Sequence, residues 1–183
     1  MNQRALPIIG LILLSGCGPF NLTASSPAAV APSLQPLPTE IAAASEWIEV
    51  DLANQEVLLH RDGAVVAQFP AATGLTTYAK YRTPAGVFDI QVKQKGPIEN
   101  VPGVFVSDML IYDLEGGIGI HSRPMDAEDN LLDERLGLPI TGGCVRVGES
   151  AQVYDFAKAG MWVWVHWPPI LGGLPADRRP VVV

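Results

Sequence analysis

Hydrophobic and polar residues alternate along short runs through the middle and end of the chain. The first runs, residues 46–52 and 56–61, are separated by a turn, and Asp62-Gly63 then leads into a third run at residues 64–73. A period of two places successive side chains on opposite faces of a sheet, and an Asp-Gly pair favours a tight hairpin. The pattern therefore predicts a meander of three antiparallel strands.

Further strand-like runs follow, punctuated by Pro and Gly, at residues 86–92, 103–113, 117–121 and 161–167. One helix is predicted over residues 150–160, with Ser150 as its N-cap and Gly160 as its stop. The sequence thus predicts a mostly β domain at residues 46–168, with one or two short helices. Its length of about 120 residues is normal for a domain that buries its own core.

A short apolar segment precedes the predicted domain. Arg4 is followed by an apolar run over residues 6–14, and Leu-Ser-Gly then leads directly into Cys17. These features are typical of a secretory signal peptide, and Leu-Ser-Gly-Cys resembles the bacterial lipobox. The alternative, an uncleaved membrane anchor, needs roughly 20 apolar residues, more than this run supplies. We therefore expect a lipoprotein signal peptide at residues 1–16, lipidation of Cys17 and export to a bacterial membrane.

Two segments flank the predicted domain without the apolar spacing of a core. Residues 17–45 are rich in Pro, Ala and Ser, so we expect a linker between the lipidated cysteine and the domain. Residues 169–183 are predicted to be a C-terminal tail, to which we assign no chemistry.

The chain is acidic, with a formal net charge of −7 at pH 7. Nucleic-acid binding requires clustered Lys and Arg, which this sequence lacks, so we exclude nucleic acid as a partner. The sequence also lacks a ligand cluster with metal-binding spacing. We therefore expect neither a metal nor an organic cofactor.

Cys144 is the one cysteine left if Cys17 is lipidated, so it has no disulfide partner within the chain. It is either a buried, inert thiol or a nucleophile. The run TGGCVR favours the nucleophile, because Gly142 and Gly143 can turn successive N–H groups toward one point beside the sulfur and form an oxyanion hole. In an extended segment, Arg146 shares the face of Cys144 and places a cation near the thiol and any substrate carboxylate.

Three histidines are candidates for the base that a cysteine nucleophile needs. His60 lies at the end of a predicted strand, where we expect an exposed side chain, and His166 lies inside the final strand, where we expect a structural role. His121 ends the run 117–121 and opens a loop, where functional side chains are commonly presented. His121 is therefore the predicted base.

Several motifs follow one another in a fixed order between Trp47 and Trp167. They are the paired strands ending in Thr-Gly, RTPAGVF at residues 82–88, IHSRP at residues 120–124, LGLPITGGCVRV at residues 136–147, and the closing helix and strand. Each motif is weak alone, but their order and spacing are specific. Together they resemble the L,D-transpeptidase catalytic domain of bacterial cell-wall enzymes, also called YkuD-like. The resemblance implies a β-sandwich or barrel-like domain.

The resemblance also implies cysteine-dependent acyl transfer on the peptide stems of peptidoglycan. A donor tetrapeptide stem would lose its terminal D-alanine, and an amine acceptor would then form a 3–3 cross-link, or water would trim the stem. Cys144 would be the nucleophile and His121 the base. The remaining implied site residues are Ser122, whose carbonyl orients the His121 ring, Gly143 and Cys144, whose N–H groups stabilise the oxyanion, and Thr141, Gly142 and Arg146 for substrate binding. We expect a monomer that faces the cell wall from its lipid anchor.

Gly142 departs from the family pattern, which usually has a histidine at this position. Two interpretations follow: an active enzyme with an altered rate or acceptor preference, or a catalytically weak or inactive lipoprotein that binds stems. A papain-like protease is disfavoured, because its cysteine begins a helix, whereas Cys144 precedes the strand-like run VRV.

The segment 122–143 between the two predicted catalytic residues is long and acidic. Charge runs of this kind usually form solvated loops. The alternative is a lid that attracts a cationic acceptor amine through its acidic residues, Asp126, Glu128, Asp129, Asp133 and Glu134.

Overall fold

The computed structural model describes residues 37–167. The predicted signal peptide, the lipidation site Cys17, the predicted tail and most of the predicted linker lie outside the described residues. Within the described range the domain is mostly β with two short helices and one 3-10 turn, as predicted. None of the helices in this range is long and apolar enough to span a bilayer.

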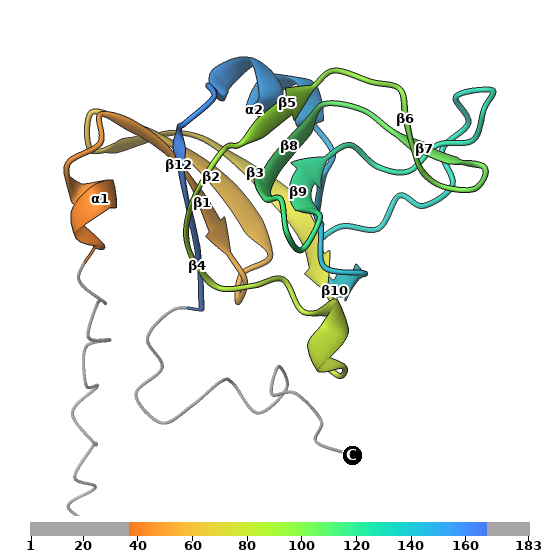
Figure 1. Ribbon diagram of the computed structural model, residues 1–183, viewed down its shortest axis with the longest axis horizontal. Helices are drawn as coiled ribbons and strands as arrows, with labels where there is room; N and C mark the ends of the chain where they lie inside the picture. Colours follow the sequence, from red (N-terminus) through yellow and green to blue (C-terminus); the bar gives the residue numbers. More distant parts are fainter. Residues whose placement is uncertain (1–36, 168–183) are drawn as a thin grey trace, which may run out of the picture. The chain divides into compact units, whose positions relative to one another are not determined.

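Ten strands form one sheet, and two more form a separate hairpin (Figure 1). The order along the sheet is β4 (Gly86–Asp89), β12 (Trp162–His166), β1 (Glu46–Asp51), β2 (Glu56–Arg61), β3 (Ala64–Gly74), β11 (Val145–Val147), β9 (Ile118–His121), β8 (Met109–Asp113) and β5 (Val92–Gln94). Off this path, β10 (Pro139–Thr141) pairs with β3. The hairpin consists of β6 (Ile98–Val101) and β7 (Val104–Val106).

The two edge strands of the sheet are close in sequence. β4 and β5 stand at opposite ends of the strand order, yet only Ile90 and Gln91 separate them along the chain. Because two intervening residues span about 11 Å at most, the sheet must curl until its edges meet. Gln91 N–H donates to the Ile111 carbonyl at 2.9 Å, and the Phe88 and Tyr112 rings pack 5.2 Å apart across this junction. The result is the predicted barrel-like domain.

The predicted meander of β1, β2 and β3 is antiparallel throughout, but two of the other predicted strands are divided. The run 86–92 breaks where the sheet curls, and the run 103–113 breaks at Asp108, which has a φ of +57°. The buried Asp108 carboxylate accepts a hydrogen bond from Ser150 Oγ at 2.7 Å and lies 3.0 Å from Lys95 Nζ. These partners hold the chain in the break.

The predicted helix is shorter than expected. The α2 helix (Ser150–Phe156) has Glu149 at its N-cap position, and Ala157 returns to an extended conformation. Ser150 is not the N-cap, because its hydroxyl donates to Asp108 instead. Gly160 adopts a φ of +77° in the turn before β12. The helix packs into the core through the fully buried Val153.

A second helix, α1 (Thr39–Ala42), lies inside the segment predicted as a linker. Its Ile41 side chain is only 1% exposed, and the helix contacts β12. The packed part of the chain therefore begins before residue 46, and the predicted linker overlaps it. A single buried side chain among Ala, Ser and Pro has no periodic pattern, so the sequence carries no signal for this contact.

The core lies inside the curled sheet. Its fully buried side chains come from alternate positions of the strands, and include Ile48, Val50, Val57, Leu110, Ile120, Val145, Val147 and Val163. Alternation therefore predicts which face of each strand is buried, and it leaves the other face for polar side chains.

A polar cluster occupies the opposite face of β1. The two Glu49 carboxylate oxygens lie 2.7 Å from His60 Nε2 and 2.8 Å from His166 Nε2. His60 stacks on Trp47 and His166 stacks on Trp164, with ring centroids 3.7 and 3.9 Å apart. His60, predicted to be exposed, is therefore buried, because the carboxylate and the indole cover it. Both histidines belong to the scaffold.

The carboxylate of Glu49 is expected to stabilise the fold in a pH-dependent manner. Burial by itself raises the pKa of Glu49, but the hydrogen bonds from His166 and His60 outweigh it and lower the pKa to about 2. This folded-state pKa lies below the ordinary value of 4.5. The stabilisation is therefore present above about pH 4.5 and is lost as the pH falls toward 2.

We expect Glu49→Gln to lower the free energy of unfolding by about 2 kcal/mol at pH 7, because charge-assisted hydrogen bonds are lost. The difference from the unaltered protein should shrink at pH 3. Urea unfolding at both pH values measures the effect, with the exposed Asp62→Asn as a control. An equal loss at both pH values would contradict the linkage.

Candidate active site

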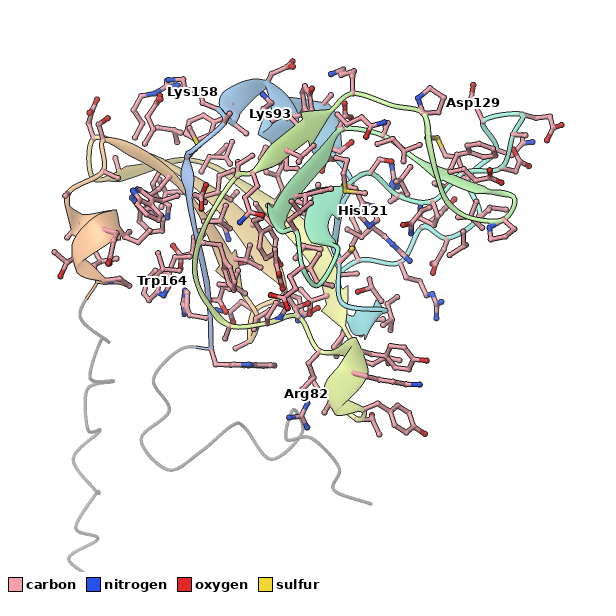
Figure 2. All side chains as sticks on the ribbon, in the orientation of Figure 1. Arg82, Lys93, His121, Asp129, Lys158 and Trp164 are labelled. Carbon is pink, nitrogen blue, oxygen red and sulfur yellow. The ribbon has the colours of Figure 1, made fainter. Side chains whose placement is uncertain are left out.

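A cavity of about 490 Å³ brings together residues that are far apart in the sequence. Five of the predicted site residues line it: His121, Thr141, Gly142, Cys144 and Arg146. The other lining residues come from the β6–β7 hairpin, from the turn before β9 and from the acidic segment. Figure 2 labels His121, the last residue of β9, which lies next to β8 in the sheet.

The parallel pairing of β9 with β11 sets the relative positions of the two catalytic candidates. Val145 pairs with Ile120, and Arg146 pairs with His121. Val145 and Ile120 are both buried in the core, so the neighbouring side chains point to the opposite face of the sheet. Cys144, Arg146 and His121 therefore share the face that lines the cavity, as predicted for Cys144 and Arg146.

The His121 ring is fixed by its own chain neighbour. His121 Nδ1 lies 2.7 Å from the Ser122 carbonyl oxygen, which is the contact that the resemblance implied. A carbonyl oxygen only accepts, so Nδ1 carries the proton and Nε2 keeps its lone pair. Burial lowers the pKa of His121 to about 4; the Ser122 bond opposes this shift and the charge of Arg146 adds to it. At neutral pH the ring is therefore an uncharged base.

The sulfur of Cys144 is half-buried and lies at the cavity surface. Its Sγ–H faces the Gly117 carbonyl oxygen at 3.7 Å. Burial raises the pKa of the thiol above its ordinary value of 9.0, although a hydrogen bond from the Gly119 backbone opposes the shift. We expected these surroundings to favour the thiolate, but desolvation outweighs the single N–H donor. The resting pair is therefore a neutral thiol and a neutral imidazole.

Hydrogen bonds within the segment 141–144 hold the predicted oxyanion donors. Gly143 N–H donates to Thr141 Oγ1 at 3.2 Å, and the Thr141 hydroxyl donates to the Cys144 carbonyl at 2.5 Å. The Gly143 donor, predicted to face the substrate, is thus already engaged, because the Thr141 hydroxyl lies within its reach. Within residues 37–167, the Cys144 N–H donates no hydrogen bond. Cys144 therefore supplies the free backbone donor.

Thr83 braces this segment from a distant part of the chain. Its hydroxyl donates to the Gly143 carbonyl at 2.7 Å and accepts a hydrogen bond from Gly74 N–H at 2.8 Å. The side chain is only 6% exposed. Thr83 lies in the motif RTPAGVF, but the sequence assigned it no role, because its partner is 60 residues away. Its place inside that motif was the one feature of the sequence that could have pointed to a role for Thr83.

The guanidinium of Arg146 is held by the acidic segment. Arg146 NH1 lies 2.9 Å from Asp133 Oδ2, while its buried Nε has no hydrogen-bond partner within the described residues. Hydrogen bonds from Arg135, with a smaller contribution from Arg146, keep the pKa of Asp133 well below its ordinary value. Asp133 therefore fixes an arginine rather than attracting an amine from solution.

The other acidic residues of the segment divide into two groups. Asp126 accepts hydrogen bonds from Asn130 inside its own turn. Glu128, Asp129 and Glu134 are exposed. Of the five acidic residues, these three remain available for the lid interpretation. Backbone pairing of Met125 with Phe105 ties the segment to β7.

Comparison with known proteins connects this geometry to a family. Residues 45–165 match the family described as YkuD, the L,D-transpeptidase catalytic domain. The chain belongs to this family. No curated protein sequence matches it significantly.

Solved L,D-transpeptidases share the fold. One from Mycobacterium smegmatis is 21% identical with a TM-score of 0.51, and the match covers 67% of this chain and 59% of that one. One from Mycobacterium tuberculosis H37Rv is 20% identical with a TM-score of 0.53, covering 67% and 57%. A fragment from Xylanimonas cellulosilytica is 23% identical with a TM-score of 0.50, covering 67% and 61%. The match thus spans less than two thirds of each of these structures.

Gly142 occupies the position where this family usually has a histidine. A Cβ atom placed on Gly142 would meet no atom within 4 Å, and the backbone there is not left-handed. A side chain could therefore start at residue 142 without a clash at its Cβ atom. In this L,D-transpeptidase domain, Gly142 thus lines the cavity beside Cys144 without a side chain.

Loss of the Thr83 hydroxyl is expected to loosen residues 141–144 of this L,D-transpeptidase domain, which we call the nucleophile segment because they carry the predicted nucleophile. Thr83→Val leaves the buried Gly143 carbonyl and Gly74 N–H without their partner, which costs about 1 to 3 kcal/mol, so it should slow acylation of Cys144 by a carbapenem about tenfold or more. Thr83→Ser keeps the hydroxyl and should restore most of the rate. Mass spectrometry of the adduct over time gives the rates, and thermal unfolding confirms that both variants fold. Equal rates for Thr83→Val and Thr83→Ser would remove this role.

Proposed function

We propose that this protein is a peptidoglycan L,D-transpeptidase with Cys144 as its nucleophile. The observation that carries the proposal is the His121 ring, which is bound through Nδ1 to the Ser122 carbonyl at 2.7 Å and lines the same cavity as Cys144. This arrangement leaves the Nε2 lone pair as the base for the thiol. Family membership supports the reaction type.

The first half-reaction transfers an acyl group to sulfur. His121 Nε2 takes the proton from Cys144 Sγ, and the thiolate attacks the carbonyl carbon between the third stem residue and the terminal D-alanine. The carbon–nitrogen bond then breaks, and the imidazolium returns its proton to the amine of D-alanine. D-alanine leaves, and a thioester to Cys144 remains.

The second half-reaction releases the acyl group. An acceptor amine, deprotonated by His121, attacks the thioester, the carbon–sulfur bond breaks and the sulfur recovers its proton. The product is a 3–3 cross-link between two stems. Water in place of the amine gives a trimmed tripeptide, which is the carboxypeptidase side reaction. His121 thus acts as base and acid in turn.

Both groups are neutral at rest, so the proton moves from Cys144 to His121 as the thiol attacks. The Cys144 N–H, free within the described residues, supports the tetrahedral oxyanion. Thr141 and Thr83 keep the Gly143–Cys144 peptide in position for this donor. Arg146 supplies a nearby cation that suits a stem carboxylate.

We also propose that the protein is an exported lipoprotein anchored through Cys17 and facing the cell wall. The Leu-Ser-Gly-Cys sequence after a short apolar run supports this assignment. Radiolabelled palmitate should be incorporated into the full chain expressed in a bacterium, and Cys17→Ser should abolish the label. A labelled Cys17→Ser variant would exclude this attachment site.

A stem-binding lipoprotein without turnover is the second candidate. Two observations favour it: glycine replaces the usual histidine at residue 142, and burial raises the pKa of the Cys144 thiol. The raised pKa reduces the fraction of reactive thiolate, and the glycine removes an imidazole from the neighbourhood of the thiol.

Release of D-alanine from a defined tetrapeptide stem separates these candidates. We expect the full chain to release it and Cys144→Ala to release none. The rate should fall as the pH approaches 4, where His121 becomes protonated, and should level off toward neutral pH, because the uncharged imidazole then takes the proton from the uncharged thiol. Mass spectrometry of the stem measures the product. Stems left intact by the unaltered chain would favour the binder.

A further inference from the structure

The loop between β3 and β4 carries exposed aromatic and cationic side chains. We call residues 75–83, which include the 3-10 turn η1 (Ala79–Tyr81), the tyrosine loop. Tyr78 is 59% exposed and Tyr81 is 36% exposed, and their rings meet edge to face with centroids 6.2 Å apart. Lys80 Nζ lies 4.6 Å from the Tyr81 ring centroid. Figure 2 shows Arg82 extending from this loop away from the sheet.

The charge of the tyrosine loop is opposite to that of the chain. It contains Lys80 and Arg82 and no acidic residue, whereas the whole chain has a net charge of −7. Both cations are exposed, and Arg82 uses only Nε, which donates to the Thr76 carbonyl at 3.0 Å. Neither aromatic ring belongs to the core cluster. The loop therefore offers ring surface and positive charge to a partner.

Hydrogen bonds attach both ends of the loop to the nucleophile segment. Leu75 N–H donates to the Thr141 carbonyl at 3.0 Å, and Thr83 Oγ1 donates to the Gly143 carbonyl at 2.7 Å. In between, the Arg82 carbonyl oxygen would lie 3.6 Å from a Cβ atom on Gly143. A partner held on the loop is therefore held next to the peptide that carries the nucleophile.

We propose that the tyrosine loop docks the glycan strand of the polymer while the cavity takes one of its stems. This inference rests on the proposed function. A tyrosine ring offers a flat apolar face to the C–H-bearing face of a sugar ring, and Lys80 and Arg82 pair with carboxylates of neighbouring stems. Two contacts on one polymer raise the effective concentration of the stem at the cavity.

Co-sedimentation with purified peptidoglycan sacculi tests the docking surface. The full chain carries Cys144→Ala in every sample, so that covalent capture does not contribute. We expect Tyr78→Ala combined with Tyr81→Ala to weaken apparent binding roughly tenfold, because one of two contacts on the polymer is lost. Lys80→Gln should weaken it less, and only at low salt.

The matched control is Val65→Ala combined with Val66→Ala. These two side chains are 49% and 48% exposed near the start of β3, outside the tyrosine loop, and their removal should leave binding unchanged. Thermal unfolding verifies that each variant is folded.

Three results would overturn the proposal: no sedimentation of the parent Cys144→Ala chain, equal sedimentation of the tyrosine variant and its parent, or an equal loss in the valine control. A fourth result would also overturn the proposal. If the tyrosine variant kept its sacculus binding but lost binding to anionic phospholipid vesicles, the loop would be assigned to a membrane instead. Sedimentation requires no turnover. A failure of D-alanine release by the chain with Cys144 intact therefore tests the proposed function separately.

Discussion

The parallel pairing of β9 with β11 is the constraint on which the site depends. Arg146 lies opposite His121 in this register, and the buried pair Val145 and Ile120 keeps the register from slipping. A slip of one residue would turn Cys144 into the core and remove the thiol from the base. The rest of the sheet supports this pairing, because the short link at Ile90 and Gln91 forces it to curl around the core that holds these two strands.

Desolvation sets the chemical state of the site. Burial favours the uncharged forms of both Cys144 and His121, so one cavity holds a neutral thiol and a neutral imidazole whose proton is already on Nδ1. Geometry rather than a standing charge therefore prepares Cys144 for its proposed role. Two threonine hydroxyls provide much of that geometry. Thr141 binds the backbone at Gly143 and Cys144, and Thr83 binds the Gly143 carbonyl from the loop between β3 and β4.

Three features surround Cys144. Gly142 opens space where the family usually places an imidazole, and Asp133 uses one acidic side chain to fix Arg146. The tyrosine loop adds exposed rings and cations beside the same segment. The proposed chemistry at Cys144 and His121 is thus surrounded by a rim of exposed rings and cations, which is where we propose that a large polymer makes its other contacts.

Local patterns in the sequence determined the strand faces and the antiparallel meander. The order of the motifs predicted Cys144 and His121 as a pair, and the two residues line one cavity. Only the tertiary structure decided that β12 inserts between β1 and β4, that Ile41 packs into the domain, that His60 is buried against Glu49 and that Thr83 reaches Gly143. Alternation reports which side of a strand is buried, but it does not report which distant segment lies there. Such partners depend on how the whole sheet closes. The closure of the sheet also buries the Cys144 thiol, and this desolvation outweighs the hydrogen bond that lowers its pKa.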